Sequence, residues 1–383
     1  MKNKILTLSR IIVGLVFIFS GFVKAVDPWG STYKFIDYYH DAFHLNFLDF
    51  TALPMAFILS ALEFIAGIAL VFNIFTKLFT WIALAFMVIF TPLTLYLALA
   101  DPVHDCGCFG DAIVMTNWQT FGKNVFILLL ILFVFLYRKN ISPYFSKKLQ
   151  YISLSGTVFL IFGFQFWNFS HLPVIDFRAY KIGTYIPDKM IVPEGASKDE
   201  YQIFITLKDT VLNKEIEIEM QQYSKDSNYW GKTTKYKYIK QSESKLIKRG
   251  YLPPINNLTL NDSNGVNVLD SALKDPNYSL WLIAYRIEKA SLNGLKKGNE
   301  IAKYCKEHGL KFYFLTASPQ NEINDLKTKI PNWSANIYTT DPITLKTIVR
   351  AHPGLVLLKK GTILNKWHYN DFPDTNDLPN ILK

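Results

Sequence analysis

The chain has 383 residues, half of them hydrophobic and 19% charged, with a formal net charge of +10. The charge is uneven, because residues 1–170 hold only 11 of the 41 Lys and Arg and 8 of the 31 Asp and Glu. This division excludes a single soluble globule, and the apolar content excludes a disordered chain. With no long basic run, nucleic-acid binding is not expected. The three cysteines are too few for a disulfide scaffold. The composition indicates a membrane protein with a soluble C-terminal part.

Five apolar stretches are long enough to cross a membrane, which takes about 20 residues. They lie near 5–24, 52–72, 78–99, 120–137 and 150–168. Arg10 and Lys24 flank the first stretch, where long basic side chains can reach the two interfaces. The first stretch also has features of a cleavable signal peptide, since lysines precede an apolar run. The buried Arg10 and the four further stretches favour a retained helix.

The basic residues near the stretches predict an orientation. With a cytoplasmic N-terminus, seven basic residues fall on that side and three on the other: Lys2, Lys4, Lys77, Arg138, Lys139, Lys147 and Lys148 against Lys24, Lys34 and Lys123. Five spans then place residues 171–383 outside the cytoplasm. We therefore expect a protein of the bacterial inner membrane with a periplasmic C-terminal domain. If the fifth stretch does not span, that domain lies inside.

The C-terminal part changes pattern at Gly250. Before it, the alternating runs Tyr201–Leu207 and Glu215–Met220 predict strands in a β-rich connector. After it, strands alternate with helices; the expected strands are Ser279–Tyr285, Lys311–Thr316, Asn336–Thr339, Gly354–Lys359 and Ile363–His368, and the expected helices are Ser291–His308, Gln320–Lys329 and Asp341–Arg350. This order is typical of an α/β sandwich. The fold class expected for the whole chain is α+β, a transmembrane helical bundle followed by an extracytoplasmic α/β domain.

The loop Asp105–Asp111 holds two cysteines one residue apart, Cys106 and Cys108, with Gly107 between them. On the outer side of a membrane the surroundings favour disulfides, and so small a ring is expected to be strained and therefore oxidising. A quinone or a partner's thiol can reach a loop at the membrane surface. One interpretation is a redox-active pair, in which the acidic Asp105 and Asp111 would raise the thiol pKa and slow attack. The other is a fixed bridge, or two free thiols, that holds the loop.

A metal site is not expected in this loop, because two sulfurs need two further ligands. Nearby, the sequence offers only Asp105, Asp111 and the more distant His104 and His44.

Glu63 lies in the middle of the second apolar stretch. An ionisable group at membrane depth is costly and often functional. Its expected partner is Arg10 or Lys24, so these three residues form a candidate membrane-embedded polar site. The pair either locks helix register or serves a bound quinone, whose proton Glu63 would take.

The first stretch resembles the opening signature of the DoxX membrane family through Arg10, Gly14, Ser20, Gly21, Lys24 and Pro28. With Glu63 and the loop 106–110, which reads Cys-Gly-Cys-Phe-Gly, residues 1–140 also resemble the related MauE proteins. The resemblance implies a four-helix membrane domain over 1–140. It also implies a role in quinone-linked or thiol-linked electron transfer, or in maturing a partner's disulfides, with Cys106 and Cys108 as the redox pair.

Residues 251–383 resemble a thioredoxin fold of the peroxiredoxin and thiol-disulfide-interchange kind. His352 and Pro353 match the cis-proline position of that family. The redox cysteines expected after the first buried strand are missing, because residues 285–291 contain none. Without a thiolate there is no exchange chemistry, but the cis-proline groove is expected to bind an extended peptide. Cys305 is expected to be a buried core residue.

The predicted order of domains is the DoxX/MauE-like bundle 1–140, a fifth transmembrane helix 141–170, the connector 171–250 and the cysteine-free thioredoxin-like domain 251–383. The leading hypothesis is an envelope redox protein that passes electrons through Cys106 and Cys108 between an envelope protein partner and a membrane quinone. The alternative is a non-catalytic scaffold or assembly subunit of an envelope complex. A solute transporter has less support, because the sequence has no inverted repeat.

Overall fold

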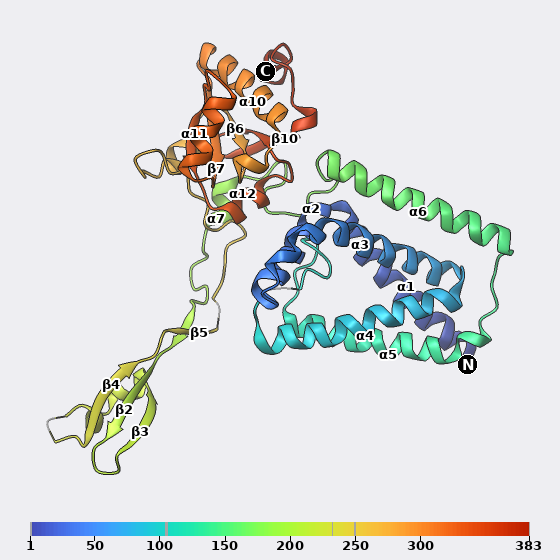
Figure 1. Ribbon diagram of the computed structural model, residues 1–383, viewed down its shortest axis with the longest axis horizontal. Helices are drawn as coiled ribbons and strands as arrows, with labels where there is room; N and C mark the ends of the chain where they lie inside the picture. Colours follow the sequence, from blue (N-terminus) through green and yellow to red (C-terminus); the bar gives the residue numbers. More distant parts are fainter. Residues whose placement is uncertain (1, 104–105, 232, 249, 383) are drawn as a thin grey trace. The chain divides into compact units, whose positions relative to one another are not determined.

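The computed structural model describes residues 2–103, 106–231, 233–248 and 250–382 (Figure 1). The chain forms two compact units, one made of Met1–Ile186 with Asn257–Lys383 and the other of Pro187–Asn256. The first unit begins with apolar helices and ends in a sheet-rich part, so the expected α+β class is confirmed.

Six helices make up the N-terminal part: α1 (Lys2–Val26), α2 (Pro28–Asp37), α3 (Asp49–Phe72), α4 (Thr76–Ala100), α5 (Asn117–Tyr137) and α6 (Lys147–Ser170). Of the described residues, five stretches are long and apolar enough to cross a membrane: Asn3–Val26, Asn46–Phe72, Thr76–Ala100, Asn117–Asn140 and Lys147–Ser170. These agree with the five stretches predicted from the sequence. The chain is therefore a membrane protein with five candidate spans.

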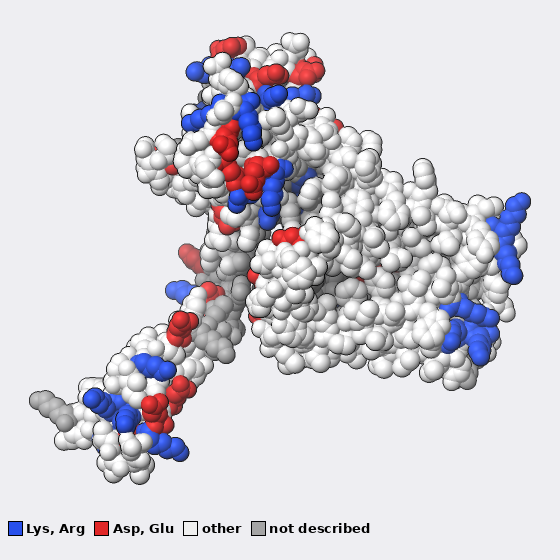
Figure 2. Space-filling model, in the orientation of Figure 1, with Lys and Arg blue, Asp and Glu red and all other residues white. Residues whose placement is uncertain are grey.

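Charged side chains are nearly absent from the sides of these helices on the face shown in Figure 2. Lys and Arg gather instead at the end of the bundle where α5 ends and α6 begins (Figures 1 and 2). Apolar sides and a basic end are typical of helical bundles that span a membrane.

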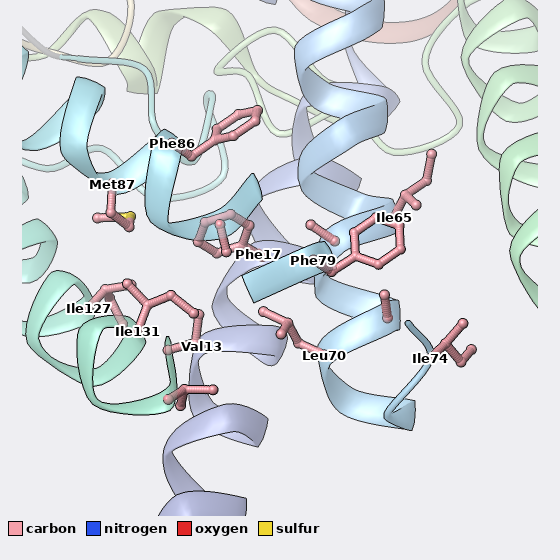
Figure 3. Close-up of a cluster of buried hydrophobic side chains, with 14 of the residues drawn as sticks. Val13, Phe17, Ile65, Leu70, Ile74, Phe79, Phe86, Met87, Ile127 and Ile131 are labelled. Carbon is pink, nitrogen blue, oxygen red and sulfur yellow. The ribbon is translucent and has the colours of Figure 1, made fainter. Parts of the chain in front are cut away.

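The bundle core is an apolar cluster contributed mainly by α1, α3, α4 and α5 (Figure 3), and Ile161 of α6 joins it. Glycines bring α1 and α3 close together: a Cβ at Gly21 would lie 2.4 Å from the Phe64 backbone nitrogen, and one at Gly67 would lie 2.5 Å from that of Ile18. Small residues at such contacts are typical of membrane helices, which associate by close packing. This contact sets the register that places Lys24 opposite Glu63.

Helix α6 packs on α3 and α1 and keeps much of its surface exposed. Gln165 in α6 donates to the Ser60 hydroxyl of α3 at 2.6 Å. A hydrogen bond between helices away from water helps to fix their mutual position.

The C-terminal part contains a five-stranded sheet with the order β10-β9-β6-β7-β8. Its strands are β6 (Tyr278–Ile283), β7 (Lys311–Thr316), β8 (Asn336–Thr339), β9 (Gly354–Lys359) and β10 (Thr362–His368). The strands β6, β7 and β8 are parallel, β9 pairs antiparallel with β6, and β10 pairs antiparallel with β9. The accompanying helices are α9 (Leu269–Leu273), α10 (Leu292–Glu307), α11 (Gln320–Lys329), α12 (Pro342–Ile348) and α13 (Leu378–Ile381).

The core of this part lies between the sheet and helices α10 and α11. Alternate residues of a strand face one side, so Leu280 and Leu282 of β6 and Leu355 and Leu357 of β9 reach the same core. The peptide bond His352-Pro353, just before β9, is cis. The order of strands and helices agrees with the expected α/β sandwich, while the thioredoxin-like resemblance stays a prediction.

The segment that follows α6 packs against the C-terminal part. Lys366 of β10 has only 2% of its side chain exposed and contacts Asp176 of this segment. Its ammonium also donates to the Tyr180 carbonyl at 2.9 Å. A buried charge is stable only when its partners stay in place. Residues 176–180, which supply partners of Lys366, therefore belong with the C-terminal sheet.

The second unit contains α8 (Met220–Lys225), the pair β1 (Glu200–Gln202) with β5 (Lys245–Lys248), and a three-stranded antiparallel sheet of order β3-β2-β4. The sheet strands are β2 (Phe204–Asp209), β3 (Lys214–Glu219) and β4 (Tyr236–Gln241). The strands expected at 201–207 and 215–220 therefore lie close to their predicted places. The helix α7 (Ile186–Met190) stands where the chain passes between the units.

Candidate functional site

The loop between α4 and α5 is fixed at both ends by polar side chains. Helix α5 begins with a capping box, in which Thr116 and Gln119 satisfy each other's backbone N–H groups. Asn117 donates its amide to the carbonyl of Val103 at 2.9 Å and to the Asp101 carboxylate at 3.0 Å. These contacts bring the two ends of the loop together and hold the cysteines against the bundle.

Cys106 and Cys108 form a disulfide within this loop, with Cα atoms 5.4 Å apart. Gly107 between them has φ of +62°, a conformation that glycine adopts readily. The backbone N–H of Cys108 donates to the Cys106 sulfur at 3.2 Å. Tyr38 donates its hydroxyl to the Cys106 carbonyl. The pair is thus bonded, but its position beside other groups decides what it can do.

The disulfide borders a cavity of about 90 Å³ inside the helical bundle, here called the bundle cavity. This is several times the roughly 10–15 Å³ that one water needs. Its apolar walls include Phe17, Phe86, Met87 and Phe90. Its polar lining includes Ser20, Lys24, Lys34, Glu63, Lys123 and Asn124, together with both cysteines. An apolar cavity with a few convergent polar groups is the usual form of a small-molecule site.

Glu63 and Lys24 form a largely buried ion pair in this cavity, with side chains 9% and 20% exposed. The Lys24 ammonium lies 2.8 Å from both carboxylate oxygens of Glu63. The Ser20 hydroxyl lies 2.8 Å from Glu63 Oε2 and 2.8 Å from the Cys108 carbonyl oxygen, and its single proton can be donated to one of them at a time. Residues 20 and 24 share a helix face because they are four apart. A short polar chain therefore links the ion pair to the cysteine loop.

Arg10 does not join this site. It is buried near the other end of α1, where it donates to the Leu70 carbonyl and, at 3.3 Å, to the Tyr144 hydroxyl. Of the three polar residues expected together, the structure brings together Lys24 and Glu63 only. Arg10 instead ties α1 to the end of α3 and to the segment before α6.

Of the two acidic residues expected to act on the cysteines, only Asp111 is described. Arg350 contacts Asp111 at 3.2 Å, and Asp105 and His104 lie outside the described residues. Among the described residues, three lysines and one glutamate line the bundle cavity. In the sequence Lys24 was an expected partner of Glu63, whereas Lys34 and Lys123 served only as orientation markers, so the convergence of the three lysines was missed. Positive charge near a sulfur favours the thiolate, which is the opposite of the expected effect.

Arg350 links the C-terminal part to the helical part. Its guanidinium, only 8% exposed, lies 2.8 Å from Asp27. Asp27 also caps α2 by accepting from the Gly30 N–H at 2.8 Å. Burial alone would raise the pKa of Asp27, but Arg350 and Arg178 lower it on balance. Burial would lower the pKa of Arg350, but Asp27 and Asp111 raise it above its usual range. Both groups therefore stay charged.

His352 and the cis Pro353 lie beside aromatic side chains rather than in an open groove. The His352 ring stacks on Tyr285 with centroids 4.0 Å apart and hydrogen-bonds the Arg286 carbonyl at 2.7 Å. Burial lowers the pKa of His352 to about 4. Tyr33 of α2 meets Tyr285 edge-on at 6.2 Å. The surface expected to bind a peptide is therefore partly covered by α2 of the same chain.

Residues 2–137 match the family described as Methylamine utilisation protein MauE. The resemblance to MauE is thereby confirmed for the helical part, while the resemblances to DoxX and thioredoxin stay predictions. No curated protein and no solved structure matches the chain. The N-terminal part of the chain, residues 2–137, is a MauE family domain with membrane-like helices.

Proposed function

We propose that the protein is a membrane electron-transfer component in which Cys106 and Cys108 carry electrons from thiols to a quinone. The observation that carries the proposal is the position of the disulfide in the wall of the bundle cavity, beside the Lys24–Glu63 pair. A structural bridge needs no such cavity or buried charge. Ionisable groups held at membrane depth are costly, and their usual reason is function.

The first half-reaction is thiol–disulfide exchange. Two thiols of a partner protein become a disulfide, and the bond between Cys106 and Cys108 breaks to give two thiols. Two electrons therefore move to the cysteine pair. The lysines that line the bundle cavity favour this step, because they stabilise the cysteine thiolate that forms.

The second half-reaction restores the disulfide. Two electrons and two protons leave Cys106 and Cys108 for a membrane quinone, which is released as the quinol. The residues present fit such a group, since the aromatic walls suit a ring while Lys24 and Asn124 suit its oxygens. Glu63, in contact with Lys24 and Ser20, can hold a proton during this transfer. A quinone bound there supplies the electron acceptor.

The C-terminal α/β part would hold the partner in this scheme. Its strand order and cis proline support the thioredoxin-like resemblance, and the described residues 285–291 after β6 contain no cysteine. We further propose that the cysteine loop and this domain lie on the periplasmic side of the bacterial inner membrane. The basic end of the bundle near α6 supports that orientation (Figure 2).

A second function is equally compatible with the fold, namely a scaffold or assembly subunit of an envelope complex. The observation that favours it is the C-terminal part, whose single cysteine, Cys305, is fully buried. Under this function the loop disulfide only holds its loop. Removing the protein would then dissociate a complex without changing the redox state of any thiol.

The test uses the full chain in lipid nanodiscs, with the loop disulfide reduced and the reductant removed. A short-chain quinone is added, and alkylation with a mass tag follows the loss of the two thiols. We expect quinone to restore the disulfide far faster than the matching quinol, with Cys305 as an unreactive internal reference. Equal rates with quinone and quinol would refute the electron-transfer function and leave the scaffold function.

A further inference from the structure

A second cavity approaches the cysteine loop from outside the bundle. This loop cleft has a volume of about 270 Å³ and lies between α1–α2, the cysteine loop, the segment around Arg178, and α12. Its lining is more polar than that of the bundle cavity and includes Asp27, Asp37 and Lys346. Four residues line both cavities, namely Lys24, Ser31, Lys34 and Gly107. The backbone between the two cysteines is therefore reached from both sides.

The stem of Lys34 forms part of the wall between the two cavities. Its Cγ, Cε and Cδ lie 2.9, 3.2 and 3.3 Å from where a Cβ at Gly107 would stand. The loop cleft touches Gly107, but the two cysteines are not among its described lining residues. Lys34 therefore borders both the cleft and the bundle cavity, whose lining includes both cysteines.

The two sulfurs are not equivalent. Cys106 is buried, with 8% of its surface exposed, whereas Cys108 is partly exposed. The Cys108 N–H donates to the Cys106 sulfur at 3.2 Å. A hydrogen bond to sulfur stabilises its charged form, the thiolate. Exchange is faster when the sulfur that leaves is more stable as a thiolate, so Cys106 is the better leaving group.

We propose that a substrate thiolate enters through the loop cleft past Lys34 and attacks the sulfur of Cys108, expelling Cys106 as the thiolate. This inference rests on the proposed function and assigns its first half-reaction. The new bond joins the substrate sulfur to Cys108, and the electron pair of the broken bond goes to Cys106. A second substrate thiol, as thiolate, attacks the substrate sulfur of this mixed disulfide and releases Cys108 as a thiolate. The substrate is thereby oxidised by two electrons and the pair reduced by two.

The chemistry of the cleft fits an anionic sulfur. Lys24, Lys34, Lys346, Arg178 and Arg350 line it, against Asp27, Asp37 and Asp111. Among the described lining residues, cations therefore outnumber anions. A thiolate of this kind belongs either to a cysteine on an extended polypeptide segment or to a small thiol such as glutathione.

The first test compares single-cysteine variants of the full chain in nanodiscs, both built on Cys305→Ala. The probe is an unstructured peptide whose one cysteine carries a 2-thiopyridyl group, so that each mixed disulfide releases a coloured thione. Cys106→Ser leaves Cys108, and we expect it to react at least about tenfold faster than Cys108→Ser, because Cys108 is partly exposed whereas Cys106 is buried. Equal or reversed rates would overturn the assignment. Cys106→Ala and Cys108→Ala repeat the comparison should a serine variant fail to fold.

The second test removes the Lys34 side chain from the wall between the loop cleft and the bundle cavity. Lys34→Ala removes the stem, and we expect the loop disulfide to be reduced several-fold faster by the thiol peptide or by glutathione. Lys34→Met keeps the stem and should show no acceleration, and Lys274→Ala, on an exposed ion pair far along the chain, is the matched control. A larger gain for the peptide identifies a polypeptide substrate, and a larger gain for glutathione a small thiol. No gain with either would overturn the route.

The two proposals fail in different ways. Quinone-driven reoxidation with equal sulfur reactivity would leave the proposed function intact and refute this route. Selective reaction at Cys108 without any quinone-driven reoxidation would keep the route and refute the electron acceptor.

Discussion

The two parts of the chain place cysteine in opposite surroundings. Cys106 and Cys108 border a cavity that is also lined by Lys34, Lys123 and the Lys24–Glu63 pair. Cys305 lies in α10 within the apolar core of the C-terminal part, and burial raises the pKa of its thiol to about 12. Exposure and nearby charge decide the reactivity of a thiol. The surroundings of the loop cysteines therefore favour reaction, whereas those of Cys305 make its thiol inert.

Removing the cysteines tests this comparison most severely. Cys106→Ser or Cys108→Ser should abolish quinone-dependent oxidation of added thiols, because neither half-reaction proceeds without both sulfurs. Cys305→Ala should leave that rate unchanged and lower stability by about 1 kcal/mol through lost packing. Oxygen-free turnover assays in nanodiscs measure the rates, and undiminished turnover in either loop variant would contradict the account.

The buried ion pair is expected to have the next largest effect. Glu63→Gln leaves Lys24 without its carboxylate, which costs roughly 3–5 kcal/mol for a buried pair, and it should slow quinone-driven reoxidation about a hundredfold by removing the proton carrier. The double variant Lys24→Met with Glu63→Gln should recover stability but not rate. If instead the rate returns with stability, Glu63 only holds helix register.

Arg350 tests the link between the two parts. Arg350→Ala should destabilise the contact of α12 with α2 by about 3 kcal/mol, since Asp27 keeps its burial and loses its strongest partner. Hydrogen exchange should then rise in residues 27–37 and 342–350. Arg350→Lys keeps the charge and should show a smaller rise, while unchanged exchange in both variants would refute the contact.

The last prediction is a pH dependence confined to the C-terminal part. Burial lowers the pKa of His352 and of His368 to about 4, below the ordinary 6.5. The unfolded chain therefore binds more protons than the folded one between these values, so stability is present above pH 6.5 and is lost as pH falls toward 4. Thermal unfolding of this part should show that slope, and His352→Gln should reduce it. A flat profile over pH 4–6.5 would contradict the burial of both rings.

The sequence predicts the elements of both parts better than their contacts. Unbroken apolar runs marked the five spans, and alternation marked β2 and β3, because both signals are local. The partner of Glu63 was left open between Arg10 and Lys24, which lie about 21 Å apart along α1 at 1.5 Å per residue. The choice depends on the register of α1 against α3, set by Gly21 and Gly67.

The candidate site shows the same limit. The cysteine pair was visible as a motif, but the cavity beside it is assembled from α1, α2, α3, α4 and α5. Lys34 and Lys123 lie 89 residues apart in the chain, so no spacing rule connects them. The expected acidic surroundings came from neighbours in sequence, whereas the structure supplies cations from neighbours in space.

The most direct test of the central claim is the midpoint potential of the Cys106–Cys108 pair. Alkylation and mass shift of the intact protein, equilibrated at graded thiol/disulfide potentials, measure it. A pair that cycles between thiols and a quinone should titrate at about −200 mV or higher, and a structural bridge should resist reduction below about −300 mV. The account predicts the first result, and the second would contradict it in favour of the scaffold.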